Sequence, residues 1–316
     1  MNRKQFLKTI GGGTLAMTLA PNLLLAENLN IFDVKAEYKL TILHTNDQHS
    51  RIEPVEASYT RNPNQGGFAR RAALIEKIRK ENSNILLLDS GDTFQGTPYF
   101  NFFGGELEFK LMSMMGYDAS TMGNHDFDNG LEGFKKVQAN AKFPFICSNY
   151  DFKNTILDGQ TIPYKIFNKN GIKVGIFGVG IELAGLVGKK QYGETVYENP
   201  IEVAQHYSEF LRNEKKCDLV ICLSHIGYDY RDNPNKISDK ILAAKTDGID
   251  LILGGHTHTF LPEPQTFTNR KGKNVLVNQV GWAGLLLGKL DFYFDKNKNV
   301  KNISWHNQVI DDTILV

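Results

Sequence analysis

The feature that most constrains the fold is a series of short apolar runs, each followed at once by polar residues. The clearest is residues 85–88, one Ile and three Leu with no polar residue between them. An apolar run without alternation is typical of a strand that is buried on both faces. Amphipathic segments such as residues 68–80 and 200–215 separate the runs. This order predicts an α/β fold in which helices cover the strands, one of which is expected at residues 143–148.

Length and composition fit a globular protein of ordinary make-up. The chain has 316 residues, and its last part, from residue 274 onward, is predicted to be all β. We expect one domain over residues 38–316. The formal net charge of +1 argues against a nucleic-acid-binding surface, which would carry a basic surplus. Three cysteines without a tight pattern argue against a disulfide framework.

The N-terminus has the pattern of a targeting segment. A basic start around Arg3 and Lys4 precedes a mildly apolar run that contains three glycines. We interpret residues 1–26 as a signal peptide, because this run is too short and too broken to span a membrane. The pattern resembles a twin-arginine export signal with Lys4 in the second basic place, and general secretion stays open. Residues 27–37 are expected to be a linker, and the protein to be periplasmic or extracytoplasmic.

Polar side chains follow five of the predicted strands. The carboxyl ends of parallel strands meet at one edge of a sheet, where ligands bind. We therefore expect these side chains to share one crevice. In chain order they are Asp47 and His49, Asp92, Asn124, His225, and His256 with His258.

This mixture of side chains predicts bound metal ions. Each residue alone has a structural explanation, such as a turn or a hydrogen-bonded loop. Collected in one place, the His, Asp and Asn side chains suit borderline divalent metals such as zinc, manganese, iron or cobalt. They are too many for one ion, so we expect two divalent ions that share a carboxylate.

The ordered motifs resemble a known superfamily. The set D-x-H, G-D-x-x-x-G, G-N-H-D, the lone His225 and G-H-T-H is similar to the calcineurin-like metallophosphoesterases. The segments HTNDQHS, LLLDSGDTFQGTP, GNHDFD and GGHTH resemble the catalytic domain of the 5′-nucleotidase branch, from about Lys39 to the end of the chain. The resemblance implies a four-layer α/β/β/α sandwich, with two mixed β-sheets flanked by helices.

The resemblance also implies a role for each motif residue. One metal would be bound by Asp47, His49, Asp92 and His258, and the second by Asp92, Asn124, His225 and His256. The catalytic residues would be His125, which faces the substrate phosphate, and Asp128, which orients the His125 ring. Asp126 receives no role, and Asp89 is expected to close its strand. The implied reaction is attack on the phosphorus of a nucleotide or other phosphoester by a metal-bridging hydroxide.

Substrate choice stays open at this point. Full-length members of the 5′-nucleotidase family carry a C-terminal domain that binds base and phosphate, and Val316 lies about where that domain would begin. The chain can act alone with broad specificity, or with a separate polypeptide that carries the second domain. Thiosulfohydrolase-like or cyclic-nucleotide phosphodiesterase activity, or a non-catalytic metal-binding subunit, are the alternatives. The loop at residues 260–267 and Trp282 are candidates for lining the site.

Overall fold

The computed structural model describes residues 36–316, which form one compact unit. The signal peptide predicted over residues 1–26, and the linker up to residue 35, lie outside the described residues. Within the described part of the chain, no helix has the length and apolar character needed to cross a bilayer.

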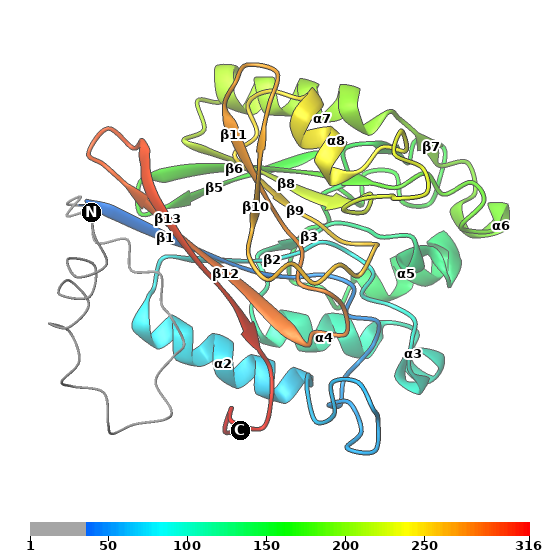
Figure 1. The fold of residues 1–316 in the computed structure, drawn as a ribbon. Coiled ribbons are helices and arrows are strands. Elements are labelled where there is room, and N and C mark those ends of the chain that lie inside the picture. The colour runs from blue at the N-terminus through cyan, green and yellow to red at the C-terminus, as the bar shows by residue number, and fades with distance from the viewer. Residues whose placement is uncertain (1–35) are drawn as a thin grey trace, which may run out of the picture. The chain divides into compact units, whose positions relative to one another are not determined.

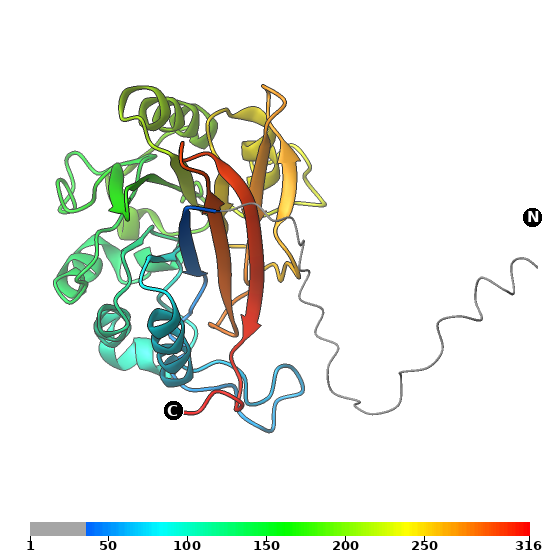
Figure 2. The same ribbon diagram turned by 90° about the vertical axis from the view of Figure 1, so that its left-hand side faces the viewer.

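The first sheet has five strands in the order β13-β12-β1-β2-β3. Its centre is parallel: β1 (Tyr38–Thr45) pairs with β2 (Ile85–Asp89), which pairs with the short β3 (Ala119–Ser120). The C-terminal hairpin of β12 (Leu286–Phe294) and β13 (Val300–Val309) joins β1 in antiparallel register. Figure 2 shows this hairpin in orange and red beside β1.

The second sheet has six strands in the order β10-β11-β9-β8-β6-β5. Four of them are parallel: β6 (Ile172–Gly180), β8 (Leu219–His225), β9 (Leu251–Leu253) and β11 (Asn274–Asn278). The outer strands β5 (Tyr164–Lys169) and β10 (Gln265–Thr268) are antiparallel to their neighbours. A separate pair is formed by β4 (Tyr150–Asp151) and β7 (Val196–Tyr197).

Helices cover the outer face of each sheet (Figure 1). On the first sheet lie α2 (Phe68–Glu81), α4 (Glu106–Met114) and α5 (Gly130–Gln138). On the second lie α7 (Pro200–Glu209) and α8 (Asp239–Lys245). Three apolar clusters fill the interfaces, one between the sheets and one beneath each helical layer. The four-layer sandwich of two mixed sheets is therefore confirmed.

Strand β2 shows why its apolar run has no alternation. Leu86 and Leu88 pack between the two sheets, whereas Ile85 and Leu87 pack beneath the helices. Both faces of the strand are buried, as the sequence predicts.

Several local predictions differ from the structure. Residues 143–148 form only isolated bridges, because Pro144 lacks the N–H that a strand ladder needs. The helix predicted over residues 200–215 leaves α geometry after Glu209 and ends in a π-helical turn, Phe210–Glu214. The short helices α3 (Pro98–Phe103) and α6 (Lys189–Tyr192), and the 3-10 turn His125–Phe127, are additional elements.

The two sheets meet at the edge where their parallel strands end. The Ser90 hydroxyl, just after β2, donates a hydrogen bond to the Leu253 carbonyl at the end of β9, at 2.7 Å. The backbone N–H of His256 donates to both carboxylate oxygens of Asp47, at 3.0 Å each. The loops that follow β1, β2 and β9 are thereby held together.

Candidate metal centre

The first group of ligand atoms belongs to Asp47, His49 and His258, which lie within 4.8 Å of one another. The Nε2 atoms of the two imidazoles are 2.9 Å apart, and His258 Nε2 is 3.3 Å from Asp47 Oδ1. Burial lowers the pKa of His49, although the charges of Asp92 and Asp47 oppose this. Two neutral imidazole nitrogens that face each other are favourable only with a shared proton or cation between them.

The second group belongs to Asp92, His225 and His256. His225 Nε2 lies 3.1 Å from Asp92 Oδ2, and the Asn124 side-chain oxygen lies 2.8 Å from His256 Nδ1. His49 Nε2 is also 3.9 Å from Asp92 Oδ2. Asp92 thus lies between the two groups, as does Asp47, whose Oδ1 is 3.9 Å from His225 Nε2, and the structure brings all seven predicted ligand residues together.

The imidazoles are oriented from behind by backbone carbonyls. His49 Nδ1–H points to the Phe94 carbonyl at 3.1 Å, and His225 Nδ1–H points to the Ser90 carbonyl at 2.6 Å. A ring that donates from Nδ1 presents an unprotonated Nε2 to a metal. The buried Nε2 of His225 makes no hydrogen bond in the described structure. The unpaired Nε2 of His225, and the Nε2 of His49 that faces His258, fit a divalent ion in each group.

The pKa values of the buried side chains also indicate that the site favours a bound cation. Burial lowers the pKa of His225, but the close contact with the charged Asp92, the charge of Asp47 and the hydrogen bond to Ser90 together raise this pKa to about 10. In turn, although burial opposes it, the charge of His225 holds the pKa of Asp92 well below its usual range. Buried carboxylates need a compensating positive charge, and bound cations would supply it.

The backbone at most of the candidate ligand residues adopts φ angles from a sparsely populated part of the allowed range. Left-handed φ angles between 48° and 73° occur at five of the seven ligand candidates: Asp47, His49, Asp92, His256 and His258. Such a conformation costs a non-glycine residue about 1–3 kcal/mol and persists where the surroundings enforce it. Here it turns the side chains of successive loops toward one point.

Gly123 is required by the close approach of two loops. A Cβ atom at this position would lie 2.2 Å from Asp92 Oδ1 and 2.6 Å from His225 Cε1. The glycine lets the backbone before Asn124 pass directly against two ligand side chains.

His125 and Asp128 form a pair next to the first group. His125 Nδ1–H donates to Asp128 Oδ2 at 2.8 Å, and the His125 ring is edge-on to the His49 ring, with centroids 5.3 Å apart. The hydrogen bond to Asp128 raises the pKa of His125, against the opposing effect of burial. The His125 side chain is 40% exposed, so a partly accessible imidazole with a carboxylate behind it borders the centre.

Asp126 has a structural role that sequence reasoning missed. Its carboxylate accepts four backbone N–H groups: those of Asp92, Thr93 and Phe94 at 3.0–3.3 Å, and that of Gly123 at 2.8 Å. It therefore joins the loop after β2 to the turn after β3. Its place inside the G-N-H-D motif was a signal, but the sequence does not name its partners. Asp89 closes its strand as expected, with hydrogen bonds from Thr45 and Gln48 among others.

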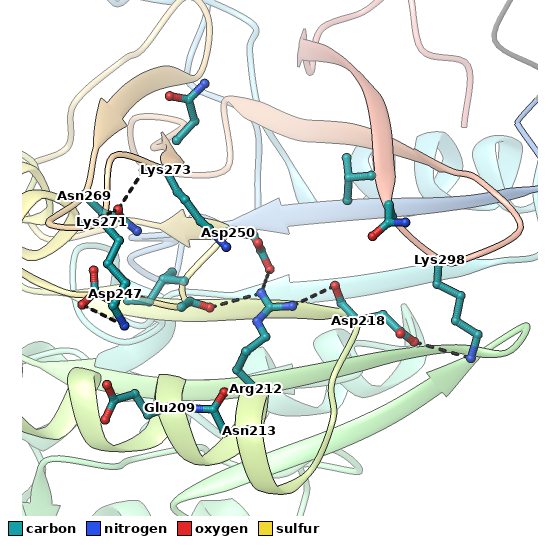
Figure 3. A pocket seen from close by; sticks show the side chains of 15 residues that line it. Glu209, Arg212, Asn213, Asp218, Asp247, Asp250, Asn269, Lys271, Lys273 and Lys298 are labelled. Carbon is teal, nitrogen blue, oxygen red and sulfur yellow. Dashed lines mark hydrogen bonds and ion pairs between the residues drawn. The ribbon is translucent and has the colours of Figure 1, made fainter.

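The large cavity in Figure 3, about 430 Å³, lies at the opposite edge of the second sheet. Its lining includes Asp218 and Asp250, which precede β8 and β9. Arg212 binds Asp250 and the Asp218 carbonyl, and Lys298 lies 3.7 Å from the Asp218 carboxylate. The cavity contains none of the candidate ligands, and its charges are largely paired with one another. We therefore place the chemistry at the metal centre.

Comparisons with known proteins agree with this geometry. A sequence profile described as calcineurin-like phosphoesterase matches residues 40–260. A snake venom 5′-nucleotidase from Gloydius brevicauda is 35% identical over 291 residues, 83% of this chain and 46% of that protein. The chain spans about half the length of the curated relatives it matches.

Solved structures show the same similarity. The crystal structure of a 5′-nucleotidase precursor from Thermus thermophilus has a TM-score of 0.78 at 31% identity, covering 88% of this chain and 55% of that one. A calcineurin-like phosphoesterase from Bacillus subtilis has a TM-score of 0.71 at 25% identity, covering 88% of this chain and 92% of that one.

Proposed function

Because the chain belongs to the calcineurin-like phosphoesterase family, we propose that it is a metal-dependent hydrolase of phosphate monoesters, with 5′-nucleotides as substrates. The observation that carries this proposal is the position of Asp92. Its Oδ2 lies 3.1 Å from His225 Nε2 in one ligand group and 3.9 Å from His49 Nε2 in the other. A carboxylate shared by two groups is the arrangement that a two-ion phosphoester hydrolase needs. The names of the relatives, 5′-nucleotidases, support the choice of substrate.

We assign the ligands as the geometry suggests. Asp47, His49 and His258 would hold one divalent ion, and Asn124, His225 and His256 the other, with Asp92 between them. Zinc, manganese, iron and cobalt all suit this donor set. When bound, the ions supply an activated hydroxide and neutralise the phosphoryl oxygens. Asp47 and Asp92 bring two negative charges, so the loaded centre keeps a positive charge that attracts a phosphate.

His125 is the residue proposed to move a proton. Its raised pKa favours the imidazolium form, and Asp128 holds the ring by its Nδ1–H. The opposite nitrogen is then free to donate to a phosphoryl oxygen or to the leaving oxygen of the substrate. The backbone N–H of His125 donates to Asp92 Oδ1 at 2.8 Å, which fixes the residue relative to the ligands.

Export is part of the proposal and rests on the basic, then apolar, N-terminal sequence. Expression of the full chain followed by cell fractionation tests it. We expect a mature form that begins near Glu27 outside the cytoplasm. A full-length product that stays in the cytoplasm would refute export without bearing on the chemistry.

Phosphate release tests the activity. The chain is loaded with manganese or zinc and assayed on AMP beside an aryl phosphate. We expect turnover of AMP, with the nucleoside in contact with Trp282, whose ring stacks on His258, and with the exposed Phe260. Aryl phosphate turnover without AMP turnover would assign nucleotide recognition to a separate polypeptide, to be sought by co-purification. Tight metal binding without turnover of either ester would favour a non-catalytic subunit.

A further inference from the structure

The loop between β8 and α8 places a tyrosine and a lysine beside the metal centre. The ring of Tyr230 lies 6.5 Å from the ring of His256, centroid to centroid. The Tyr230 hydroxyl donates to the Ile226 carbonyl at 2.7 Å, which fixes the ring. The ammonium group of Lys236 lies over this ring, 4.0 Å from its centroid. The imidazole of His256, the phenol of Tyr230 and the ammonium group of Lys236 are therefore successive neighbours.

Lys236 differs from its neighbour Lys240 in having no counter-ion. Lys240 lies over Tyr228 at 6.0 Å, and its Nζ is 2.9 Å from Asp229 Oδ2. For Lys236, no carboxylate within residues 36–316 lies within 4.0 Å of Nζ, and no hydrogen bond from Nζ is formed. Both lysines lie over a tyrosine ring, but only Lys236 has no carboxylate partner among the described residues.

The surroundings of Lys236 compensate its charge only in part. Its side chain is half-buried. A cation–π contact stabilises by about 0.5–2 kcal/mol. This compensates only part of the hydration free energy that a half-buried ammonium group loses. An anion that enters the site would supply the missing counter-charge.

We propose that Lys236 is a substrate-binding residue that contacts a phosphate oxygen of the bound substrate. This inference rests on the proposed function, because it takes the ligand of the centre to be a phosphate ester. Two oxygens share this chemistry: one on the phosphoryl group that is cleaved, and one on a second phosphate next to it. Tyr230 acts as the platform that holds the ammonium group near His256.

Three variants separate charge from packing. Lys236→Met keeps an unbranched stem over the Tyr230 ring and removes the charge. Lys236→Arg keeps the charge. Lys240→Met removes the charge of the paired lysine on α8 and serves as the matched control. All three are compared with the wild type after loading with manganese, and equal melting temperatures show that the fold is kept.

The measurements are the Kd for inorganic phosphate, by calorimetry, and the KM and kcat for AMP and ADP. We expect Lys236→Met to raise the phosphate Kd or the KM about tenfold, which corresponds to about 1.4 kcal/mol, and to change kcat less than KM. Lys236→Arg should restore most of the loss, and Lys240→Met should behave as the wild type. A loss for phosphate and AMP assigns Lys236 to the cleaved group, whereas a loss for ADP alone assigns it to the second phosphate.

Two results would overturn the inference. One is a Lys236→Met variant that binds phosphate, AMP and ADP like the wild type. The other is an equal loss in Lys240→Met, or no rescue by Lys236→Arg, because either would indicate a general effect on the loop. The phosphate Kd does not require turnover, so a wild-type protein that binds phosphate without hydrolysing AMP, ADP or an aryl phosphate would refute the proposed function and still test Lys236.

Discussion

The Nε2 atoms of His49 and His258 face each other at 2.9 Å, although the two residues are 209 positions apart in the chain. His49 follows β1 of the first sheet, and His258 follows β9 of the second. A cation shared by these nitrogens and Asp47 would join the two halves of the sandwich. Metal binding should therefore contribute to stability as well as to chemistry.

Chelation tests this link between metal and stability. A ligand present at a thousand times its Kd stabilises the folded state by about 4 kcal/mol, or about 10 °C in a domain of this size. We expect a chelator to lower the melting temperature by this order, and to lower it less in His258→Ala. The exposed His206 on α7 provides the control variant His206→Ala, which should respond like the wild type. An unchanged melting temperature after chelation would contradict the metal assignment.

His125 should be needed for turnover and dispensable for metal binding. Its ring pairs with Asp128 and is proposed as the proton donor. Removal of a general acid typically costs 10²–10⁴ in rate, so we expect His125→Ala to lower kcat about a thousandfold. Metal content, measured by mass spectrometry on the purified variant, should stay at the wild-type value. A variant that also loses its metal would show that His125 is a ligand.

Asp126 should matter for stability. Replacing it with Asn puts an NH₂ group where backbone N–H donors now meet a carboxylate oxygen. A buried group that loses its hydrogen-bond partner costs about 1–3 kcal/mol, more when charge is involved, and we expect about 3 kcal/mol for Asp126→Asn in urea unfolding. The exposed Asp312→Asn is the control, with a change near zero. Equal stability of the two variants would refute the anchoring role.

Asp291 on β12 gives a pH dependence that is independent of the metal centre. Burial opposes ionisation, but hydrogen bonds from Lys289 and Thr41 lower the pKa of Asp291. Its carboxylate lies 2.7 Å from Lys289 Nζ and 3.1 Å from Lys39 Nζ. A depressed carboxyl pKa stabilises the fold above the unfolded pKa of about 3.9, and this stabilisation is lost as the pH falls through the folded pKa.

The lowered pKa of Asp291 determines how the effect of a substitution should change with pH. At pH 7, Asp291→Asn should lower the free energy of unfolding by about 2 kcal/mol, and the difference from the wild type should shrink as the pH falls below about 4. Denaturant unfolding of both proteins across pH 3–7 measures it. The exposed Asp232→Asn should show no such trend. A difference that grows toward low pH would contradict the assignment.

The fold was predictable where burial on both faces leaves a clear sequence pattern. The run at β2 identified a central strand, and the motifs identified the edge where the ligands gather. The strand predicted at residues 143–148 was wrong, since Pro144 interrupts the ladder. The short β10 was missed because a four-residue strand that is only partly buried carries little periodicity.

In the candidate site, too, some features could be predicted from the sequence and others could not. Ligand types and their order can be read from motifs, because they are local. The partners of Asp126 are spread over two loops, and the unpaired state of Lys236 depends on which carboxylates lie near it in space. Such relationships depend on the folded arrangement, and no spacing in the chain encodes them.

The most direct test of the central claim is a metal titration of the stripped protein, with phosphate release from AMP or an aryl phosphate measured at each step. The account predicts two equivalents bound per chain and activity that appears with the second equivalent. His49→Ala and His256→Ala, one variant for each ligand group, should each bind one equivalent and remain inactive. Full activity with one ion or none, or a chain that binds a single ion in the wild type, would contradict the two-ion centre.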